Sequence, residues 1–251
     1  MDALAMTAAA VALSALLSYV AYKTGCLTRG GAAASFLVGA FVGAAGSVNA
    51  FVLLTIFTLS GFAATRIGFS KKKKAGLQEG SDGERTWKNV AGVGIPPCII
   101  AAANFLFPMD PLLFDVMFIS TMTVAGADTI ASEIGVRDPK AYLITTFKRV
   151  PPGTNGGISA TGTAISTVAS LGIAAIGWLV MTGALDPLLL IPYAAGVVGN
   201  LLDSLFGTVL EDRGYISKYF NNGITAILGA VFGAGVYIAS RGRPHIFGAG
   251  G

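Results

Sequence analysis

Residues 112–133 read LLFDVMFISTMTVAGADTIASE, an apolar run that closes with two carboxylates, Asp128 and Glu133. A hydrocarbon core about 30 Å thick needs about 20 helical residues per crossing, so this run has the length of a transmembrane helix. The rest of the chain repeats the pattern, since 53% of its 251 residues are hydrophobic and only 12% are charged. A soluble domain carries about 25% charged residues. The sequence therefore predicts an all-α integral membrane protein.

Eight apolar segments have about the length that a crossing needs. The predicted spans are 3–22, 31–46, 49–66, 90–107, 112–133, 156–182, 187–210 and 222–240. The second is short and rich in Gly and Ala, which favours a tilted, broken or tightly packed helix. We therefore expect one polytopic domain over residues 1–240, with a tail at 241–251. Its larger loops are expected at about 67–88, 136–154 and 212–220.

The basic residues are distributed asymmetrically between the connections. Fifteen of the seventeen Lys and Arg lie in the four connections that follow an odd-numbered span, and the tail holds Arg241 and Arg243. Because cytoplasmic loops retain positive charge, the four basic connections are expected in the cytoplasm and the N-terminus outside. The two tail arginines lie on the opposite side in this topology. The net charge of +4 thus reflects membrane topology rather than nucleic-acid binding.

The N-terminal segment and the cysteines narrow the class further. The first basic residue, Lys23, follows the first apolar run, which is unlike a secretory signal. No Arg- and Ser-rich transit segment precedes it, so we expect a prokaryotic cell membrane. Cys26 and Cys98 lie in different hydrophobic regions without a CxxC or Cys/His cluster. Packed thiols are expected rather than a disulfide or a zinc site.

Two carboxylates fall inside predicted spans. These are Asp128 and Asp203, with Glu133 and Glu211 near the inner ends of the same helices. A carboxylate in a bilayer costs a few kcal/mol, so it normally faces a cavity, a cation or a partner. Protonation or a structural pairing is the alternative interpretation.

The chain around these carboxylates resembles a repeated unit. Asp128 is followed by Thr and Asp203 by Ser, and each aspartate precedes a basic loop. The returning spans then begin with similar motifs, NGGISA at 155–160 and NNGITA at 221–226. Internal repeats of membrane proteins place sites at the repeat interface. The pattern predicts a parallel repeat of the two helix pairs.

The chemistry of this unit suits phosphate. A helix that begins at Asn155, Gly156 and Gly157 would offer free backbone N–H groups to an anion, and the preceding loop adds Lys148 and Arg149. Carboxylates supply the hard oxygen ligands that Mg²⁺ takes together with substrate phosphates. Together these groups indicate phosphoryl transfer, in which positioning and charge neutralisation do most of the catalysis.

Each motif also has a plainer interpretation. Asn-Gly-Gly is typical of a turn or an N-cap. Lys71 to Lys74 are typical of a cytoplasmic surface that contacts anionic lipid. The spacing of Gly39 and Gly43 is typical of close helix packing.

Three stretches, DTIASEIG at 128–135, PGTNGGIS at 152–159 and DSLFGT at 203–208, match motifs of a known family. The chain resembles the polytopic membrane proteins that include the phytyl-phosphate kinase of the vitamin E pathway and its archaeal and bacterial relatives. Asn221-Asn222 and LTRGGA at 27–32 also fit, and the resemblance runs from about residue 24 to 240. One departure is AGVG at 91–94, where the family pattern has Asn-Gly.

The resemblance implies phosphorylation of a polyprenyl monophosphate, such as phytyl or geranylgeranyl phosphate, to the diphosphate. It implies CTP as donor and Mg²⁺ as cofactor. No P-loop is present, so the donor must bind differently. The residues expected to act are Asp128, Asp203, Lys148 and Arg149 in catalysis, Asp128, Glu133, Asp203 and Glu211 on the metal, and Thr154, Asn155, Gly156, Gly157, Ser159, Arg85, Asn221 and Asn222 on the nucleotide.

The expected partners are a prenyl monophosphate, a nucleoside triphosphate and membrane lipids, without nucleic acid; a homo-oligomer is compatible with the sequence. Two other classes stay open. A secondary cation transporter would also carry intramembrane aspartates in a repeated unit, although nearby basic residues would repel its cation. A non-catalytic lipid-binding scaffold would leave the paired acidic motifs unexplained.

The topology is testable with single cysteines. In a background without Cys26 and Cys98, Gly80→Cys and Asp138→Cys should both resist an impermeant thiol reagent in intact cells, because both lie in basic connections. Labelling of both positions from outside would contradict the topology.

Overall fold

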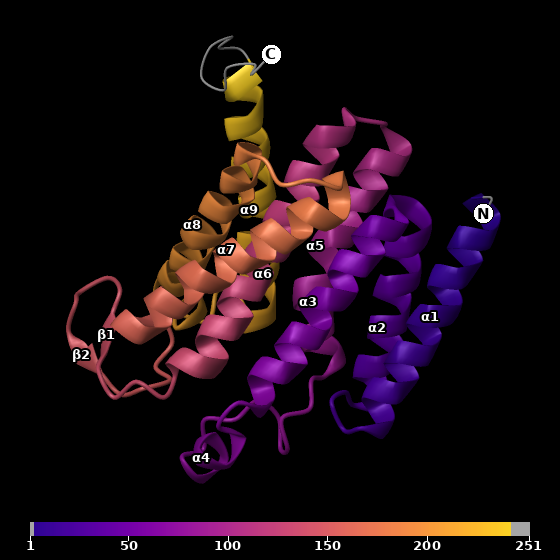
Figure 1. Cartoon of the computed structure of the whole chain (residues 1–251). Helices are drawn as coiled ribbons and strands as arrows, with labels where there is room; N and C mark the ends of the chain where they lie inside the picture. Colours follow the sequence, from indigo (N-terminus) through magenta and orange to yellow (C-terminus); the bar gives the residue numbers. More distant parts are fainter. Residues whose placement is uncertain (1–2, 242–251) are drawn as a thin grey trace.

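The computed structural model describes residues 3–241, which form long helices that run alternately up and down (Figure 1). The long helices are α1 (Ala3–Lys23), α2 (Arg29–Phe41), α3 (Val48–Arg66), α5 (Trp87–Leu106), α6 (Pro111–Gly135), α7 (Ala160–Thr182), α8 (Leu190–Phe206) and α9 (Lys218–Arg241). The shorter elements are the π-helical turns η1 (Val42–Gly46) and η3 (Gly207–Glu211), the 3-10 turn η2 (Pro187–Leu189), helix α4 (Phe69–Lys74) and strands β1 (Ala141–Leu143), β2 (Arg149–Val150) and β3 (Gly157–Ile158).

The membrane class is confirmed, and one of the predicted spans is interrupted. Within residues 3–241, seven helices are long and apolar enough to cross a membrane. The predicted span at 31–46 is the exception, because α2 has only 13 residues before the backbone widens into η1. The described chain nevertheless begins and ends at the same end of the bundle (Figure 1). The segment formed by α2 and η1 therefore still carries the chain from one end to the other.

Short polar side chains determine where several helices begin. Ser47 accepts a hydrogen bond from the backbone N–H of Ala50 and separates η1 from α3. Asp110 caps α6 through the N–H of Leu113, with Pro111 as the first helical residue. Such caps satisfy backbone donors that have no intrahelical partner.

Helix α6 is the centre of the bundle. Buried residues make up 72% of its most apolar window, whereas no other candidate span exceeds 44%. It packs against α3, α5, α7, α8 and α9. The apolar core collects along its N-terminal half, where Val116, Phe118, Ile119 and Met122 are fully buried. The functional carboxylates predicted for this helix thus lie in the most enclosed element of the protein.

The basic connections gather at one end of the bundle. Figure 1 shows α4, β1 and β2 together at the end opposite the chain termini. Residues 136–159, predicted as a loop and a helix start, instead contain a three-stranded antiparallel sheet in the order β2-β1-β3. The strands are only two or three residues long, which is too short for a periodic pattern to reveal them.

At the other end, Arg241 pairs with Asp110 at 3.1 Å and Tyr237 donates to the same carboxylate. This ion pair gives the first tail arginine a partner on the side opposite the basic loops. Arg243 and the rest of the tail lie outside the described residues. Cys26 and Cys98 are both free thiols, as expected.

Glycines allow several helices to approach closely. The prediction for Gly39 and Gly43 is confirmed, because a Cβ at either would collide with α1, at Ser14 and Ala10 respectively. At Gly92 a Cβ would lie 2.7 Å from the backbone oxygen of Tyr219 at the crossing of α5 and α9. The AGVG sequence at 91–94 therefore has a packing role in this protein.

Replacing Gly92 tests this crossing. Gly92→Ala should lower the free energy of unfolding by about 1–3 kcal/mol, because backbone atoms of α9 must move to admit the methyl group. Gly172→Ala in α7 is the control, since a Cβ there meets nothing within 4 Å. The midpoint of unfolding in detergent should fall for the first variant only. Equal midpoints would show that the crossing is loose.

Candidate functional site

A polar pocket of about 220 Å³ lies between the C-terminal parts of α6 and α8, the first turn of α7 and the 152–159 segment. Its lining brings together most of the residues that the sequence predicts for the site. They are Asp128, Thr154, Asn155, Gly156, Gly157, Ser159, Asp203, Glu211 and Asn222. Residues from both halves of the predicted repeat thus share one pocket, although the repeat itself stays a prediction.

The two intramembrane aspartates are neighbours in this pocket. Asp128 and Asp203 interact electrostatically with each other, and Asp203 also with Glu211. Asn200 Nδ2 donates to Asp128 Oδ1 at 3.4 Å, and Thr225 Oγ1 donates to Asp203 Oδ1 at 3.4 Å. Asn200 precedes Asp203 by three residues on α8, which puts both on one helix face. The three-residue spacing from Asp203 is the sequence feature that could have identified Asn200 as a site residue.

Asn221 supports Asp203 from the neighbouring helix. It lies in the first turn of α9, at the start of the returning helix as the sequence predicts. Its Nδ2 donates to the backbone oxygen of Asp203 at 3.0 Å. Its Oδ1 is buried and has no hydrogen-bond partner within residues 3–241. A buried oxygen without a donor leaves an acceptor available next to the carboxylates.

The Asn-Gly-Gly segment does not form a helix N-terminus, which corrects the prediction. Helix α7 begins after Ser159, whose side chain accepts from Gly162 N–H. Asn155 donates to Gly207 O at 3.1 Å and to Asp212 Oδ1 at 3.0 Å. Gly157 N–H donates to Thr154 O at 2.9 Å. The segment is therefore a turn that packs against η3. Residues 154–157 of this turn form part of the lining of the polar pocket.

Gly156 is the residue that this docking requires. Its φ of +67° is in the left-handed region, which glycine adopts without a steric penalty. A Cβ there would collide with the Thr208 side chain and approach Ser204 O at 2.7 Å. The plainer interpretation of the motif as a turn is the one that the geometry supports.

The cation of the pocket is Lys218, which the sequence did not single out. Lys148 and Arg149 are exposed on the sheet and do not line the pocket; Arg149 Nη2 contacts Pro139 O at 3.5 Å. Lys218 lines the pocket and interacts electrostatically with Asp128. Lys218 is the first residue of α9, and it reaches the pocket because α9 packs against α6.

Glu79 holds Lys218 in place from the loop before α5. Lys218 Nζ donates to Glu79 Oε2 at 3.0 Å, and Asn89 Nδ2 donates to Glu79 Oε1 at 2.8 Å. Burial raises the pKa of Glu79, but Lys218 and Asn89 outweigh this effect and leave the pKa below its usual range. Glu79 is therefore an anion that joins α5 to α9 at neutral pH.

Asp138 lies at the rim of the polar pocket, outside the spans. The backbone N–H of Lys140 and then the Thr161 side chain hydrogen bond to its carboxylate and lower its pKa. The rim therefore carries a negative charge at neutral pH.

Glu133 departs from the predicted metal site. Its carboxylate forms ion pairs with Lys72 and Arg85 and accepts from Thr65 Oγ1 at 2.8 Å. It is absent from the lining of the polar pocket, and so is Arg85. Lys72 is only 1% exposed, so one member of the predicted surface cluster is buried. Glu133 is the anion that allows Lys72 to be enclosed, because a buried charge needs a partner.

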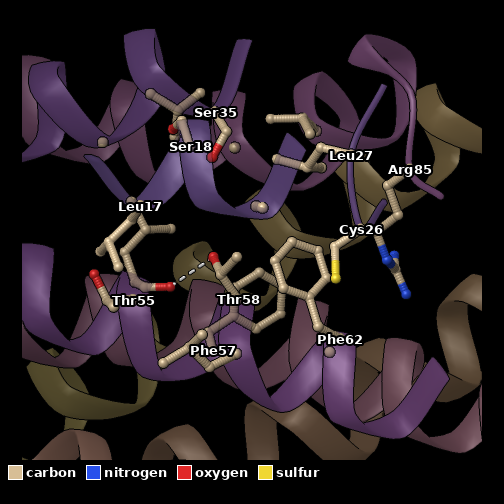
Figure 2. A pocket seen from close by; sticks show the side chains of 18 of the residues that line it. Leu17, Ser18, Cys26, Leu27, Ser35, Thr55, Phe57, Thr58, Phe62 and Arg85 are labelled. Atoms are coloured by element: carbon tan, nitrogen blue, oxygen red, sulfur yellow. Dashed lines mark hydrogen bonds between the residues drawn. The ribbon is translucent and has the colours of Figure 1, made fainter. Parts of the chain in front are cut away.

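A second, larger cavity of about 420 Å³ lies between α1, α2, α3 and α5. Figure 2 shows Leu17 and Thr55 at one end and Arg85 at the other, beyond Cys26 and Phe62. Thr129 of α6 also lines this cavity, whereas the preceding residue, Asp128, lines the polar pocket. Helix α6 is thus the wall between an apolar cavity and a polar pocket.

The donor set of the polar pocket fits a hard divalent cation only in part. Within residues 3–241, no three His, Cys, Asp or Glu side chains converge on one metal position. Two neighbouring carboxylates, Asp128 and Asp203, are nevertheless the chemistry that Mg²⁺ uses when substrate phosphates supply its other ligands. Asn221 does not line this pocket. Of the predicted ligands, Asp128, Asp203 and Glu211 lie in this pocket and Glu133 does not.

The fold and the pocket define an integral membrane protein whose polar site is enclosed by its spanning helices. The family of integral membrane proteins named DUF92 matches residues 12–235, and the chain belongs to this family. The family resemblance seen in the motifs is thereby confirmed.

Several curated proteins are similar over most of the chain. The uncharacterized membrane protein MJ0933 of Methanocaldococcus jannaschii is 30% identical over 94% of this chain and 97% of its own length. The chloroplastic protein VTE6 of Arabidopsis thaliana is 30% identical over 84% of this chain, which spans 64% of it. Protein PGR of the same plant is 31% identical over 83% of this chain and 80% of its own length. No solved structure matches the chain.

Charge removal at Glu133 tests the buried ion-pair cluster. Glu133→Gln keeps the side-chain volume but leaves Lys72 and Arg85 without an anion, and unfolding should become easier by about 3–5 kcal/mol. Asp82→Asn is the matched control, because its ion pair with Lys73 is exposed and should contribute little. Unfolding midpoints in detergent measure both. A Glu133→Gln variant as stable as wild type would contradict the role of this cluster.

Proposed function

We propose that the protein is a membrane-embedded kinase that phosphorylates a polyprenyl monophosphate to the diphosphate, with CTP as donor and Mg²⁺ as cofactor. The observation that carries the proposal is the pairing of Asp128 and Asp203 beside Lys218 in one pocket. Carboxylates and a cation at the edge of a bilayer suit the binding of a metal–nucleotide complex. The similarity to VTE6 and the family motifs support the same reaction class.

The reaction balances without an external proton donor. A terminal oxygen of the dianionic prenyl phosphate attacks the γ-phosphorus of the nucleotide and forms a new P–O bond. The bond between the γ-phosphorus and the β,γ-bridging oxygen breaks, and its electron pair leaves with the nucleoside diphosphate. Six negative charges enter and six leave, so the site must mainly neutralise and align charge.

The pocket residues divide this work among them. Asp128 and Asp203, with Glu211, would hold Mg²⁺, which neutralises phosphate oxygens when it is bound. Lys218 lies near Asp128 and would neutralise charge on the transferring phosphoryl group, a stabilisation that is strong where water is excluded. Asn222 and the backbone of Thr154 to Gly157 would orient the nucleotide from the opposite wall. Lys148 and Arg149, exposed on the sheet, would act at a distance, in the capture of the anion.

A cation transporter is the second candidate, since paired intramembrane aspartates also occur on ion pathways. Lys218 beside the pair argues against it, because a fixed cation repels a transported one. Two assays, one of phosphoryl transfer and one of cation flux, separate the two functions. Purified protein with Mg²⁺ should transfer the terminal phosphate of labelled CTP to geranylgeranyl or phytyl monophosphate, with the free prenyl alcohol as control. Cation flux in proteoliposomes without any transfer would favour the transporter.

Substitution of the aspartates tests their proposed role. Asp128→Asn and Asp203→Asn should each reduce turnover by about 10³-fold or more, because removing one preorganised electrostatic group costs about 10²–10³ and the metal loses a ligand as well. Asp82→Asn, in an exposed ion pair, is the control and should keep wild-type turnover. Labelled product separated by thin-layer chromatography measures the rate. Near-normal turnover of either variant at saturating Mg²⁺ would make that residue structural.

A further inference from the structure

We propose that the apolar cavity between α1, α2, α3 and α5 binds the prenyl tail of the acceptor, with the acceptor's phosphate at Arg85. This assignment rests on the proposed function for the identity of the ligand. The cavity itself is independent of that function, since it is a feature of the helix packing.

The cavity has the dimensions and lining of a site for one hydrocarbon chain. Its residues on α3 run from Phe51 to Phe62, which is about 16 Å along a helix axis. This is about half of a hydrocarbon core about 30 Å thick. Apolar side chains such as Leu17, Phe57 and Phe62 form its walls (Figure 2). Some hydroxyl groups of the lining already have hydrogen-bond acceptors, since Thr55 and Thr58 donate to backbone oxygens of their own helix.

The cavity is open to the side that faces lipid. Val20 of α1 and Leu59 of α3 both line it, yet they are 46% and 54% exposed. In a spanning bundle, exposed apolar residues at this depth face acyl chains rather than water. A membrane-dissolved prenyl chain can therefore enter between α1 and α3 without passing through the aqueous phase.

The polar end of the cavity carries a cation that suits a phosphate. Arg85 lines the cavity together with Asn89. Within residues 3–241, the hydrogen bonds of the Arg85 side chain, to Glu133 and Thr65, come from Nη2 alone. The guanidinium group therefore keeps donors for an anion, and Arg is suited to bidentate phosphate binding. Lys72 compensates the charge of Glu133, so the cluster retains a net positive charge.

Arg85 also places this end of the cavity next to the polar pocket. Asn89, which lines the cavity together with Arg85, donates to Glu79, and Glu79 accepts from Lys218 of the polar pocket. A phosphate held at Arg85 would therefore lie at the boundary between the tail cavity and the proposed nucleotide site. The prediction that Arg85 binds nucleotide is thus replaced by a role with the acceptor.

Blocking the far end of the cavity tests the assignment. Thr55→Phe fills the end opposite Arg85 (Figure 2) and should shorten the tail that fits. Its kcat/KM for geranylgeranyl phosphate should fall by about tenfold or more, because overpacking this end forces the long tail or the cavity walls to move. Its kcat/KM for geranyl phosphate, which has a tail of half the length, should stay within about twofold of wild type.

Thr167→Phe is the matched control. Thr167 lies on the membrane-spanning helix α7, donates to the carbonyl oxygen four residues earlier as Thr55 does, and is not part of the cavity lining. It should leave the ratio of the two kcat/KM values unchanged. Equal ratios for wild type, Thr55→Phe and Thr167→Phe would place the tail elsewhere and overturn the assignment.

A photoactivatable geranylgeranyl phosphate, with a diazirine at the end of its tail, tests binding without turnover. In the full-length protein and without nucleotide, it should label α1 and α3 around Leu17 and Thr55. Excess unlabelled geranylgeranyl phosphate should prevent labelling, and excess phosphatidylglycerol should not. Labels on α7 or α8, or competition by phosphatidylglycerol alone, would overturn the tail site while leaving the kinase proposal intact. Labels in the cavity without transfer from any nucleotide would support the tail site and remove the kinase.

Discussion

The placement of two carboxylates on one enclosed helix is the constraint on which the rest of the structure depends. Asp128 and Glu133 lie on α6, the most buried of the spanning helices. A charged group in such surroundings is costly unless a partner compensates it. Asp128 accepts a hydrogen bond from Asn200 and lies near Lys218. Glu133 forms ion pairs with Lys72 and Arg85. Each set of partners comes from a different part of the chain, so the carboxylates hold the basic connections to the bundle.

These partners also divide the protein into two chemical environments. On one side of α6, the ends of α7 and α8 and the docked turn at 154–157 enclose a polar pocket. On the other side, α1, α2, α3 and α5 enclose an apolar cavity that opens towards lipid. Arg85 and Glu79 lie near the boundary and link the loop before α5 to both sides. The proposed transfer from a water-soluble phosphate donor to a lipid acceptor would use both environments.

The motifs identified the right segments but not always the right chemistry. Asp128 and Asp203 lie together as the paired motifs suggest, because both helices run the same way and end at the same level. The Asn-Gly-Gly segment, in contrast, uses its polar groups to dock on η3. Lys148 and Arg149 precede this segment in the chain, yet they lie on or beside the small sheet and do not line the pocket. The composition of a loop does not reveal which of its polar groups hydrogen bond within the protein and which remain free to bind a ligand.

The sequence by itself determined the membrane class, the approximate spans and the grouping of the basic connections, because length, hydropathy and charge act locally along the chain. The tertiary structure decided that α2 stops short in a π-helical turn, that Lys72 is buried against Glu133 and that Lys218 is the cation of the pocket. It also created the apolar cavity, which no single segment encodes. The physical reason is that ion pairs and cavities arise between helices far apart in the chain. Their energies depend on how those helices pack against α6. The sequence of one segment does not specify its distance from the other helices.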